Sequence, residues 1–155
     1  MAPGNGGIAT TPGLKNIAIT DFSELASWAI EEEIEYTVVG PDAALAEGVV
    51  DYFESCGLKI FGPTKAAAEL EWSKDFAKAF MKRHNIPTAD YQTFSDAASA
   101  HSYIDQVGVP VVIKADGLAA GKGVVVAMTL EQAHQAIDAM MVNAQFGSSG
   151  ERVVI

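Results

Sequence analysis

The glycine-rich segment at residues 113–124 has the composition of a phosphate-binding loop. It reads Ile-Lys-Ala-Asp-Gly-Leu-Ala-Ala-Gly-Lys-Gly-Val, so three glycines and three alanines surround Lys122, and Lys114 lies on the preceding apolar run. Glycine lets backbone amides approach an anion closely and adopt positive φ. Successive amides that point the same way bind anions. Two ammonium groups on either side would offset the charge of a polyphosphate.

The spacing of this segment leaves a second interpretation open, a flexible hairpin turn with two solvated lysines. The segment is not a Walker A loop, because the spacing from Gly117 to Lys122 differs and no Ser or Thr follows the lysine. It is not a dinucleotide-binding fingerprint either, because a strand-forming run follows the loop where a helix is required. A dehydrogenase is therefore disfavoured.

Composition and charge exclude several other classes of protein. The 155 residues are 49% hydrophobic and 19% charged, which indicates one ordinary globular domain or two small units. A net charge of −10 argues against a nucleic-acid surface, which needs clustered Lys and Arg. No apolar run approaches the roughly 18 residues of a membrane span. Residues 1–13 lack the basic start and apolar core of a signal peptide, so we expect a soluble, cytoplasmic protein.

Cysteine and histidine indicate no metal centre. Cys56 is the only cysteine, which excludes an internal disulfide and a multi-cysteine site. His84, His101 and His134 lie far apart in the sequence and follow no ligand spacing. The sequence therefore predicts no metal ligands.

The first half of the chain alternates strand and helix patterns. Residues 16–19 are a short apolar run, and residues 22–34 have apolar side chains at helical spacing. Residues 36–39 are typical of a buried strand, residues 43–56 of a helix, and residues 59–61 of another short strand. Strands that alternate with helices indicate a parallel sheet, here a partial Rossmann-like one within an α/β fold. The chain opens on an expected loop with no strand before it.

The second half has the rhythm of an α+β unit. Ser73 is expected to cap a helix that runs to about His84 and ends before Pro87, so we place the unit boundary there, between residues 1–87 and 88–155. The two strands around the glycine-rich segment predict an antiparallel hairpin. The further elements expected are a strand at 91–94, a helix at 96–107, hairpin strands at 111–114 and 123–127, a helix at 129–143 and a strand at 152–155.

The glycine-rich string closely resembles the phosphate-covering loop of ATP-grasp enzymes, and within that superfamily the chain resembles the glycinamide ribonucleotide synthetase family. Other strings agree in the order that the family shows, over nearly the whole chain. These strings are Ala2-Pro3-Gly4-Asn5, Val39-Gly40-Pro41-Asp42, Phe61-Gly62-Pro63-Thr64, Ser73-Lys74, Arg83-His84-Asn85-Ile86-Pro87-Thr88 and Phe146-Gly147.

The resemblance implies an activity and a fold. The family joins phosphoribosylamine to glycine with ATP in de novo purine biosynthesis, through a glycyl phosphate intermediate. Residues 1–87 would then be a partial pre-ATP-grasp domain with linker helices, and residues 88–155 the small ATP-grasp lid subdomain. ATP and Mg²⁺ are the implied cofactors, and the implied partners are small molecules, without nucleic acid or membrane.

The resemblance also implies site residues. Lys74 resembles the lysine that reaches the nucleotide from the hinge side, and Lys114 the strand lysine that contacts the α- and β-phosphates. The mobile lid over the phosphates would comprise Gly117, Gly121, Lys122 and Gly123. Two loops resemble those near the phosphoribosylamine site, and these are Gly4-Asn5 and Gly40-Pro41-Asp42.

The residues themselves allow simpler roles. Lys74 is also typical of an exposed lysine in the first turn of a helix. Pro41 can end a strand with Asp42 capping the helix after it, and Asp116 can restrain Lys114 or Lys122. Trp28 and Trp72 are expected to be packing residues.

The chain departs from the family pattern in three places. The strand and Gly-Gly-Arg-Glu-His loop that open the family are absent, Asp42 replaces a glutamate, and the chain ends at Ile155 before the family's acidic segment. The adenine hinge, the magnesium ligands and most of the glycine site would lie beyond that end. We therefore expect no catalysis from these residues alone, and self-association through incomplete sheets. The alternatives are a nucleotide-binding module without catalysis and another ATP-grasp carboxylate–amine ligase.

Overall fold

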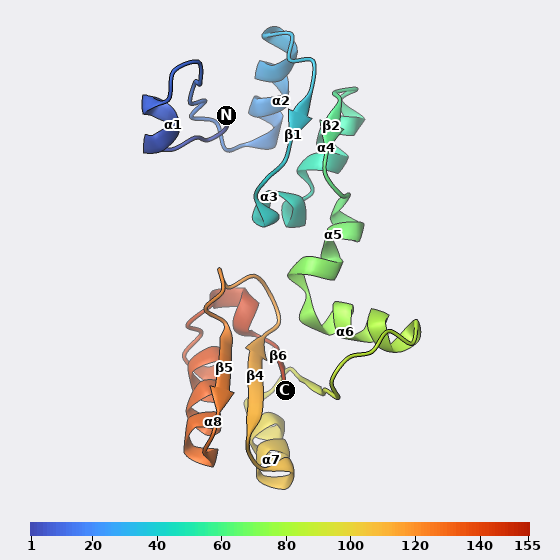
Figure 1. The fold of residues 1–155 in the computed structure, drawn as a ribbon, viewed down its shortest axis with the longest axis vertical. Coiled ribbons are helices and arrows are strands. Elements are labelled where there is room, and N and C mark those ends of the chain that lie inside the picture. Colours follow the sequence, from blue (N-terminus) through green and yellow to red (C-terminus); the bar gives the residue numbers. More distant parts are fainter. The chain divides into compact units, whose positions relative to one another are not determined.

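The chain folds into two compact units. A computed structural model describes all 155 residues, and the units are Met1–Ala68 and Glu69–Ile155 (Figure 1). Their boundary falls inside helix α5 (Lys65–Trp72), earlier than the boundary expected near Pro87. Helix α6 (Lys74–Arg83) belongs to the second unit because it is hydrogen-bonded there. The Lys74 amide donates to the Asp116 carbonyl oxygen at 3.2 Å.

The first unit contains a short parallel sheet. Strands β1 (Thr37–Val38) and β2 (Ile60–Phe61) pair in parallel, which confirms the predicted sheet. The apolar run at residues 16–19 forms no strand, and the Ile17 amide instead donates to the Met1 carbonyl oxygen at 3.0 Å. The expected opening loop contains a one-turn helix, α1 (Gly6–Thr10).

A left-handed glycine divides the helix that was predicted at residues 43–56. Gly48 has φ of 93°, a conformation that side chains with a Cβ rarely adopt, so α3 (Asp42–Glu47) ends there and α4 (Val49–Ser55) begins. The prediction of one continuous helix was wrong. Periodicity continues across a break of this kind, which is why the sequence pattern did not reveal it.

The core of the first unit lies between α4 and helix α2 (Phe22–Glu31), whose N-terminus is capped by Asp21. The fully buried side chains are Ala26, Ala29, Val49, Val50 and Phe53. Two apolar side chains of the sheet remain outside this core. Val38 and Phe61 pair in register and are 68% and 64% exposed.

The second unit is an α+β sandwich with a four-stranded antiparallel sheet. The strands are β3 (Thr93–Phe94), β4 (Val111–Ala115), β5 (Val124–Ala127) and β6 (Val153–Val154), in the order β3-β6-β4-β5. Besides α6, the helical elements are α7 (Ala97–Val107), α8 (Leu130–Ile137), a π-helix (Asp138–Val142) that continues α8, and a 3₁₀-helix (Gly147–Gly150). The predicted hairpin is confirmed by the β4–β5 pairing.

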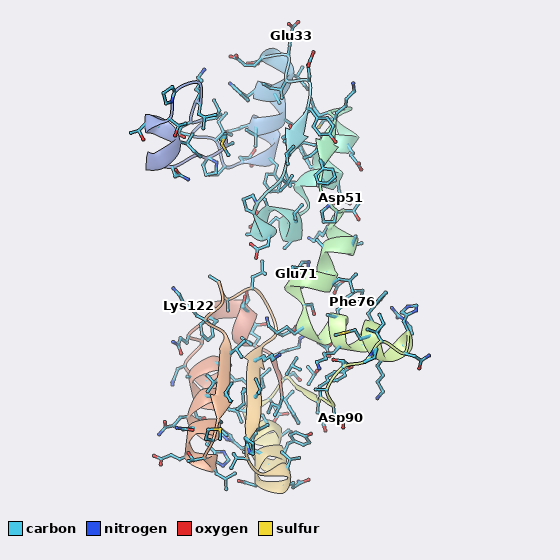
Figure 2. All side chains as sticks on the ribbon, viewed as in Figure 1. Glu33, Asp51, Glu71, Phe76, Asp90 and Lys122 are labelled. Atoms are coloured by element: carbon cyan, nitrogen blue, oxygen red, sulfur yellow. The ribbon has the colours of Figure 1, made fainter.

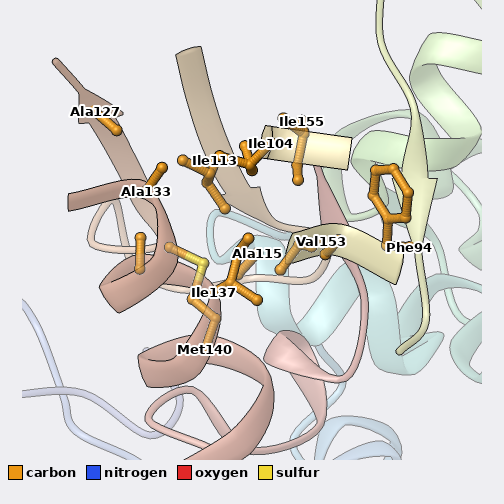
Figure 3. Close-up of a cluster of buried hydrophobic side chains, with 12 residues drawn as sticks. Phe94, Ile104, Ile113, Ala115, Ala127, Ala133, Ile137, Met140, Val153 and Ile155 are labelled. Atoms are coloured by element: carbon orange, nitrogen blue, oxygen red, sulfur yellow. The ribbon is translucent and has the colours of Figure 1, made fainter. Parts of the chain in front are cut away.

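Alternation along β4 decides which side chains are buried. Ile113 and Ala115 are fully buried in the core that α7 and α8 cover, as Figure 3 shows. Lys114 lies between them in sequence and therefore points to the opposite face of the sheet. Figure 3 also shows Ile104 from α7 and Ile137 from α8 converging on this core.

No helix in the structure combines the length and the apolar character that a membrane crossing requires.

We predict that Ile137→Ala destabilises the chain by about 2–5 kcal/mol, because it removes a side chain with no exposed surface and leaves a cavity. Leu130→Ala, at a position of the same helix that is 42% exposed, is the control and should change stability by about 0.5 kcal/mol or less. Urea unfolding of the 155-residue chain measures both. Equal losses for the two variants would contradict the assignment of this core.

Candidate functional site

Asp116 joins the end of β4 to the start of α6. Only 5% of this residue is exposed, and its carboxylate accepts hydrogen bonds from the Ser73 hydroxyl at 3.3 Å and from the Asp75 amide at 2.8 Å. The Ser73 hydroxyl in turn accepts from the Phe76 amide at 3.1 Å, which is the predicted cap of α6. Asp116 makes no hydrogen bond to Lys114 or Lys122, so the restraint suggested for those lysines is not its role.

Arg152 completes this network from the start of the last strand. Its guanidinium donates to the second carboxylate oxygen of Asp116 and lies 3.6 Å from Asp75. The hydrogen bond to Asp116 raises the pKa of Arg152 above its usual value. Thr93 also donates to Asp75, at 2.6 Å. Sequence reasoning did not find Arg152, because 36 residues separate it from Asp116 and no motif links the two.

Lys74 lies half-buried at the start of the glycine-rich loop. Its Nζ donates to the carbonyl oxygens of Asp116 at 3.2 Å and Gly117 at 3.0 Å, so it is not an exposed lysine in a first turn. Burial lowers the pKa of Lys74. The attraction of Asp116 opposes this shift, and repulsion from Lys114 adds to it.

Lys78 extends the positive charge by one helical turn from Lys74. Its Nζ donates to the Thr88 hydroxyl at 2.7 Å and the Ala89 carbonyl oxygen at 2.9 Å. Burial lowers the pKa of Lys78, and repulsion from Lys114 lowers it further. We call Lys74, Lys78 and Lys114 the lysine cluster. Sequence reasoning missed Lys78, although its spacing of four residues from Lys74 was an available signal.

The loop between β4 and β5 offers unpaired backbone donors. The amides of residues 118–121 donate to no protein acceptor in the structure, whereas the Lys122 amide donates to the Ala119 carbonyl oxygen at 2.9 Å. Ala120 and Gly121 have φ of 47° and 76°, so two successive residues are left-handed. Lys122 is exposed at the tip of the loop (Figure 2). This backbone can accept an anion without first breaking hydrogen bonds.

Two loop glycines are required by close packing. A Cβ at Gly117 would lie 2.7 Å from the Ser149 Oγ and 2.9 Å from the Ser149 Cα, and the Gly117 amide donates to the Ser149 carbonyl oxygen at 3.1 Å. A Cβ at Gly123 would lie 2.6 Å from the Cβ of Ala119. Any side chain at these positions would displace the loop.

Gly4 and Asn5 shape the opening of the first unit. Gly4 has φ of 86°, and a Cβ there would overlap the Asn16 side chain. The Asn5 side-chain oxygen accepts from the Ile8 backbone amide at 3.0 Å, and the Asn5 backbone carbonyl oxygen accepts from the Asn16 side-chain amide at 3.0 Å. Asn5 therefore has a local structural role.

Gly40, Pro41 and Asp42 are exposed at the start of α3. The helix begins at Asp42, so Pro41 holds the N-cap position and Asp42 is not the cap. The Asp42 carboxylate accepts from the next amide, that of Ala43, at 2.8 Å. No hydrogen bond joins this loop to Gly4 or Asn5.

Two family descriptions together cover the whole chain. Residues 1–71 match "Phosphoribosylglycinamide synthetase, N domain", and residues 72–155 match "Phosphoribosylglycinamide synthetase, ATP-grasp (A) domain". The division between them lies close to the boundary between the two structural units at Ala68 and Glu69.

Curated relatives match over the full chain. A phosphoribosylamine–glycine ligase from Ralstonia nicotianae is 64% identical over 155 residues, and one from Neisseria meningitidis serogroup A is 61% identical. One from Escherichia coli is 55% identical over 157 residues. In each case the match covers 100% of this chain and 37% of the relative's own length.

Solved structures support the fold. The phosphoribosylamine–glycine ligase of Thermotoga maritima has a TM-score of 0.71 and 28% identity, over 98% of this chain and 35% of that chain. The biotin carboxylase domain of the Hydrogenobacter thermophilus 2-oxoglutarate carboxylase has a TM-score of 0.72 and 21% identity, over 86% of this chain and 30% of that one. The expected fold class, a partial parallel α/β unit followed by a small α+β ATP-grasp unit, is confirmed.

The lowered pKa of Lys74 predicts how the stability of the chain depends on pH. Because folding lowers the pKa of Lys74, the unfolded chain binds more protons between the two pKa values, and the free energy of unfolding rises as pH increases through that window. Below the pKa that Lys74 has in the folded chain, the cost of burying and repelling its charged ammonium group is fully present. Lys114→Met should raise the pKa of Lys74 and reduce this rise, because it removes one repelling charge.

Lysine side-chain NMR titration of Lys74 checks the shift. Lys82→Met is the matched control, because Lys82 is exposed in the last turn of α6 and does not contribute to the pKa shift of Lys74. A pKa of Lys74 that falls or stays constant in Lys114→Met would contradict the proximity of the two ammonium groups.

Proposed function

The chain belongs to the phosphoribosylglycinamide synthetase family, and on this premise we propose that it forms part of an ATP-dependent ligase that joins phosphoribosylamine and glycine. The product would be glycinamide ribonucleotide of de novo purine biosynthesis, formed through a glycyl phosphate intermediate. The curated relatives are named as phosphoribosylamine–glycine ligases, which supports this activity. The chain spans 37% of the length of those relatives, so the reaction is assigned to the complete natural protein that carries these residues.

The observation that carries the proposal is the convergence of positive charge and free amides beside one glycine-rich loop. Lys74 is held at the loop by two carbonyl oxygens, and its pKa responds to Lys114 on the adjacent strand. The loop residues 118–121 leave four amides unpaired. These groups fit the triphosphate of ATP, whose charge would relieve the repulsion among the lysines.

In the proposed reaction the chain's residues position the phosphates and stabilise their charge. Lys74 and Lys114 would contact phosphate oxygens, and the loop with Gly117, Gly121, Lys122 and Gly123 would close over them. Phosphoryl transfer depends chiefly on such positioning and electrostatic stabilisation, and it needs no covalent protein nucleophile. No group of three or more His, Cys, Asp or Glu side chains of this chain is arranged to hold the Mg²⁺ that would accompany ATP.

The first unit would contribute to the phosphoribosylamine site. Gly40, Pro41 and Asp42 are exposed at the start of α3, where the Asp42 carboxylate is accessible for a polar substrate. The Gly4 and Asn5 segment would supply a rigid backbone, because its conformation is held by Asn16. Asp42 is the residue of these five whose side chain can contact a substrate group directly without losing a helix cap.

We predict that Lys114→Met lowers the affinity for Mg²⁺-ATP at least 10-fold. Each hydrogen bond to a charged group contributes about 1.5–3 kcal/mol, which corresponds to a factor of roughly 10–150 in binding. Lys74→Met should have a similar effect, and Lys82→Met should have none. Isothermal titration calorimetry of the 155-residue chain measures all three. Equal affinities in the wild type, Lys114→Met and Lys82→Met would refute the phosphate site.

The activity itself is tested in the complete natural protein that carries residues 1–155. Release of ADP and phosphate should require both phosphoribosylamine and glycine. Binding of ATP without turnover would favour a nucleotide-binding module without catalysis. Turnover with another carboxylate and amine would favour a different ATP-grasp ligase.

A further inference from the structure

Two histidines that lie far apart in the sequence meet between α7 and α8. The Nδ1 atoms of His101 and His134 are 2.7 Å apart, and both side chains are partly exposed, at 28% and 31%. The Nε2 of His101 lies 3.0 Å from the Asp138 carboxylate, and the Nε2 of His134 lies 3.0 Å from Asp105. Each helix thus supplies one histidine and the carboxylate that orients the histidine of the other helix.

The carboxylates determine which nitrogens are free. An ionised carboxylate only accepts hydrogen bonds, so each Nε2 must carry a proton. A neutral imidazole that carries its proton on Nε2 has a lone pair on Nδ1. The two Nδ1 atoms therefore face each other with lone pairs, and a contact of 2.7 Å requires something positive between them, either a single shared proton or a metal ion.

We propose that His101 and His134 form a binding site for a divalent transition metal, for which Zn²⁺ is the probe. Histidine ligands in metal sites usually donate their second ring nitrogen to a carboxylate, which orients the ring and raises its basicity, and both histidines have this partner. Imidazole nitrogen suits Zn²⁺, Cu²⁺ and Ni²⁺ better than Mg²⁺ or Ca²⁺. The site is independent of the proposed ATP site, because α7 and α8 supply none of its lysines.

The geometry requires only a small adjustment. Two nitrogens at about 2.0–2.1 Å from a tetrahedral Zn²⁺ are about 3.3 Å apart, so the rings must separate by roughly 0.6 Å from the 2.7 Å of the structure. Rotation of two partly exposed side chains can provide this. The partial exposure of both rings leaves room for water to complete the coordination.

The local backbone gives a second indication. Helix α8 changes at Asp138 into a π-helix, where the Asn143 amide donates to the Asp138 carbonyl oxygen at 2.8 Å. Short π-helical turns occur frequently at functional sites. Here the turn begins at the residue whose carboxylate orients His101.

Calorimetric titration of the tag-free, full 155-residue chain with Zn²⁺ tests the proposal. We expect one Zn²⁺ per chain and loss of this binding in His101→Gln and in His134→Gln. His84→Gln is the matched control and should bind like the wild type, because His84 lies at the end of α6. Absence of binding in the wild type, or binding that persists in His101→Gln, would overturn the proposal and leave the cluster as a hydrogen-bonded link between helices.

Two further measurements do not depend on replacing a ligand. Asp105→Asn should keep the fold and weaken Zn²⁺ binding by about 10- to 100-fold, the usual effect of losing a carboxylate that orients a histidine ligand. In the wild type, ¹⁵N NMR of the imidazoles should show Zn²⁺ perturbing the Nδ1 signals of both histidines. Perturbation of Nε2 alone, or unchanged affinity in Asp105→Asn, would contradict the assigned ligand atoms.

Discussion

The candidate phosphate site depends on one buried carboxylate. Asp116 is the residue at which the end of β4, the start of α6 and the start of β6 meet, through Ser73, the Asp75 amide and Arg152. A buried carboxylate is stable only when hydrogen bonds and opposite charge compensate for the lost hydration. Those same partners hold the N-terminus of α6 against the loop, and this places Lys74 there. No side chain of the loop donates a hydrogen bond to the Asp116 carboxylate, so this carboxylate positions the loop and α6 through the groups that it does bind.

The lysine cluster is an arrangement with unfavourable electrostatics in the absence of an anion. Burial and mutual repulsion both lower the pKa values of Lys74 and Lys78, and Lys114 contributes to each shift. The fold tolerates this cost because Asp116 attracts Lys74 and because neutral oxygens accept from the ammonium groups of Lys74 and Lys78. A polyphosphate bound as in the proposed function would reduce this repulsion.

His101 and His134 are brought together by the packing of two helices. His101 and His134 lie on separate helices, and the packing of α7 against α8 brings their rings together with a carboxylate at each outer nitrogen. The spacing of histidines along the chain indicated no metal ligands, because His101 and His134 are 33 residues apart and lie on separate helices. Contacts between elements follow no such spacing.

Local patterns in the sequence determined the hairpin around the glycine-rich loop, the cap at Ser73 and the parallel pairing of β1 with β2, because each depends on residues close together in the chain or on a simple alternation. The ordered motifs also indicated the family. Tertiary structure alone decided the partners of Asp116 and the inclusion of α6 in the second unit. Arg152 and Asp116 are 36 residues apart in the sequence. The partner of a buried charge depends on which groups tertiary packing places within hydrogen-bonding distance, and local sequence does not specify this.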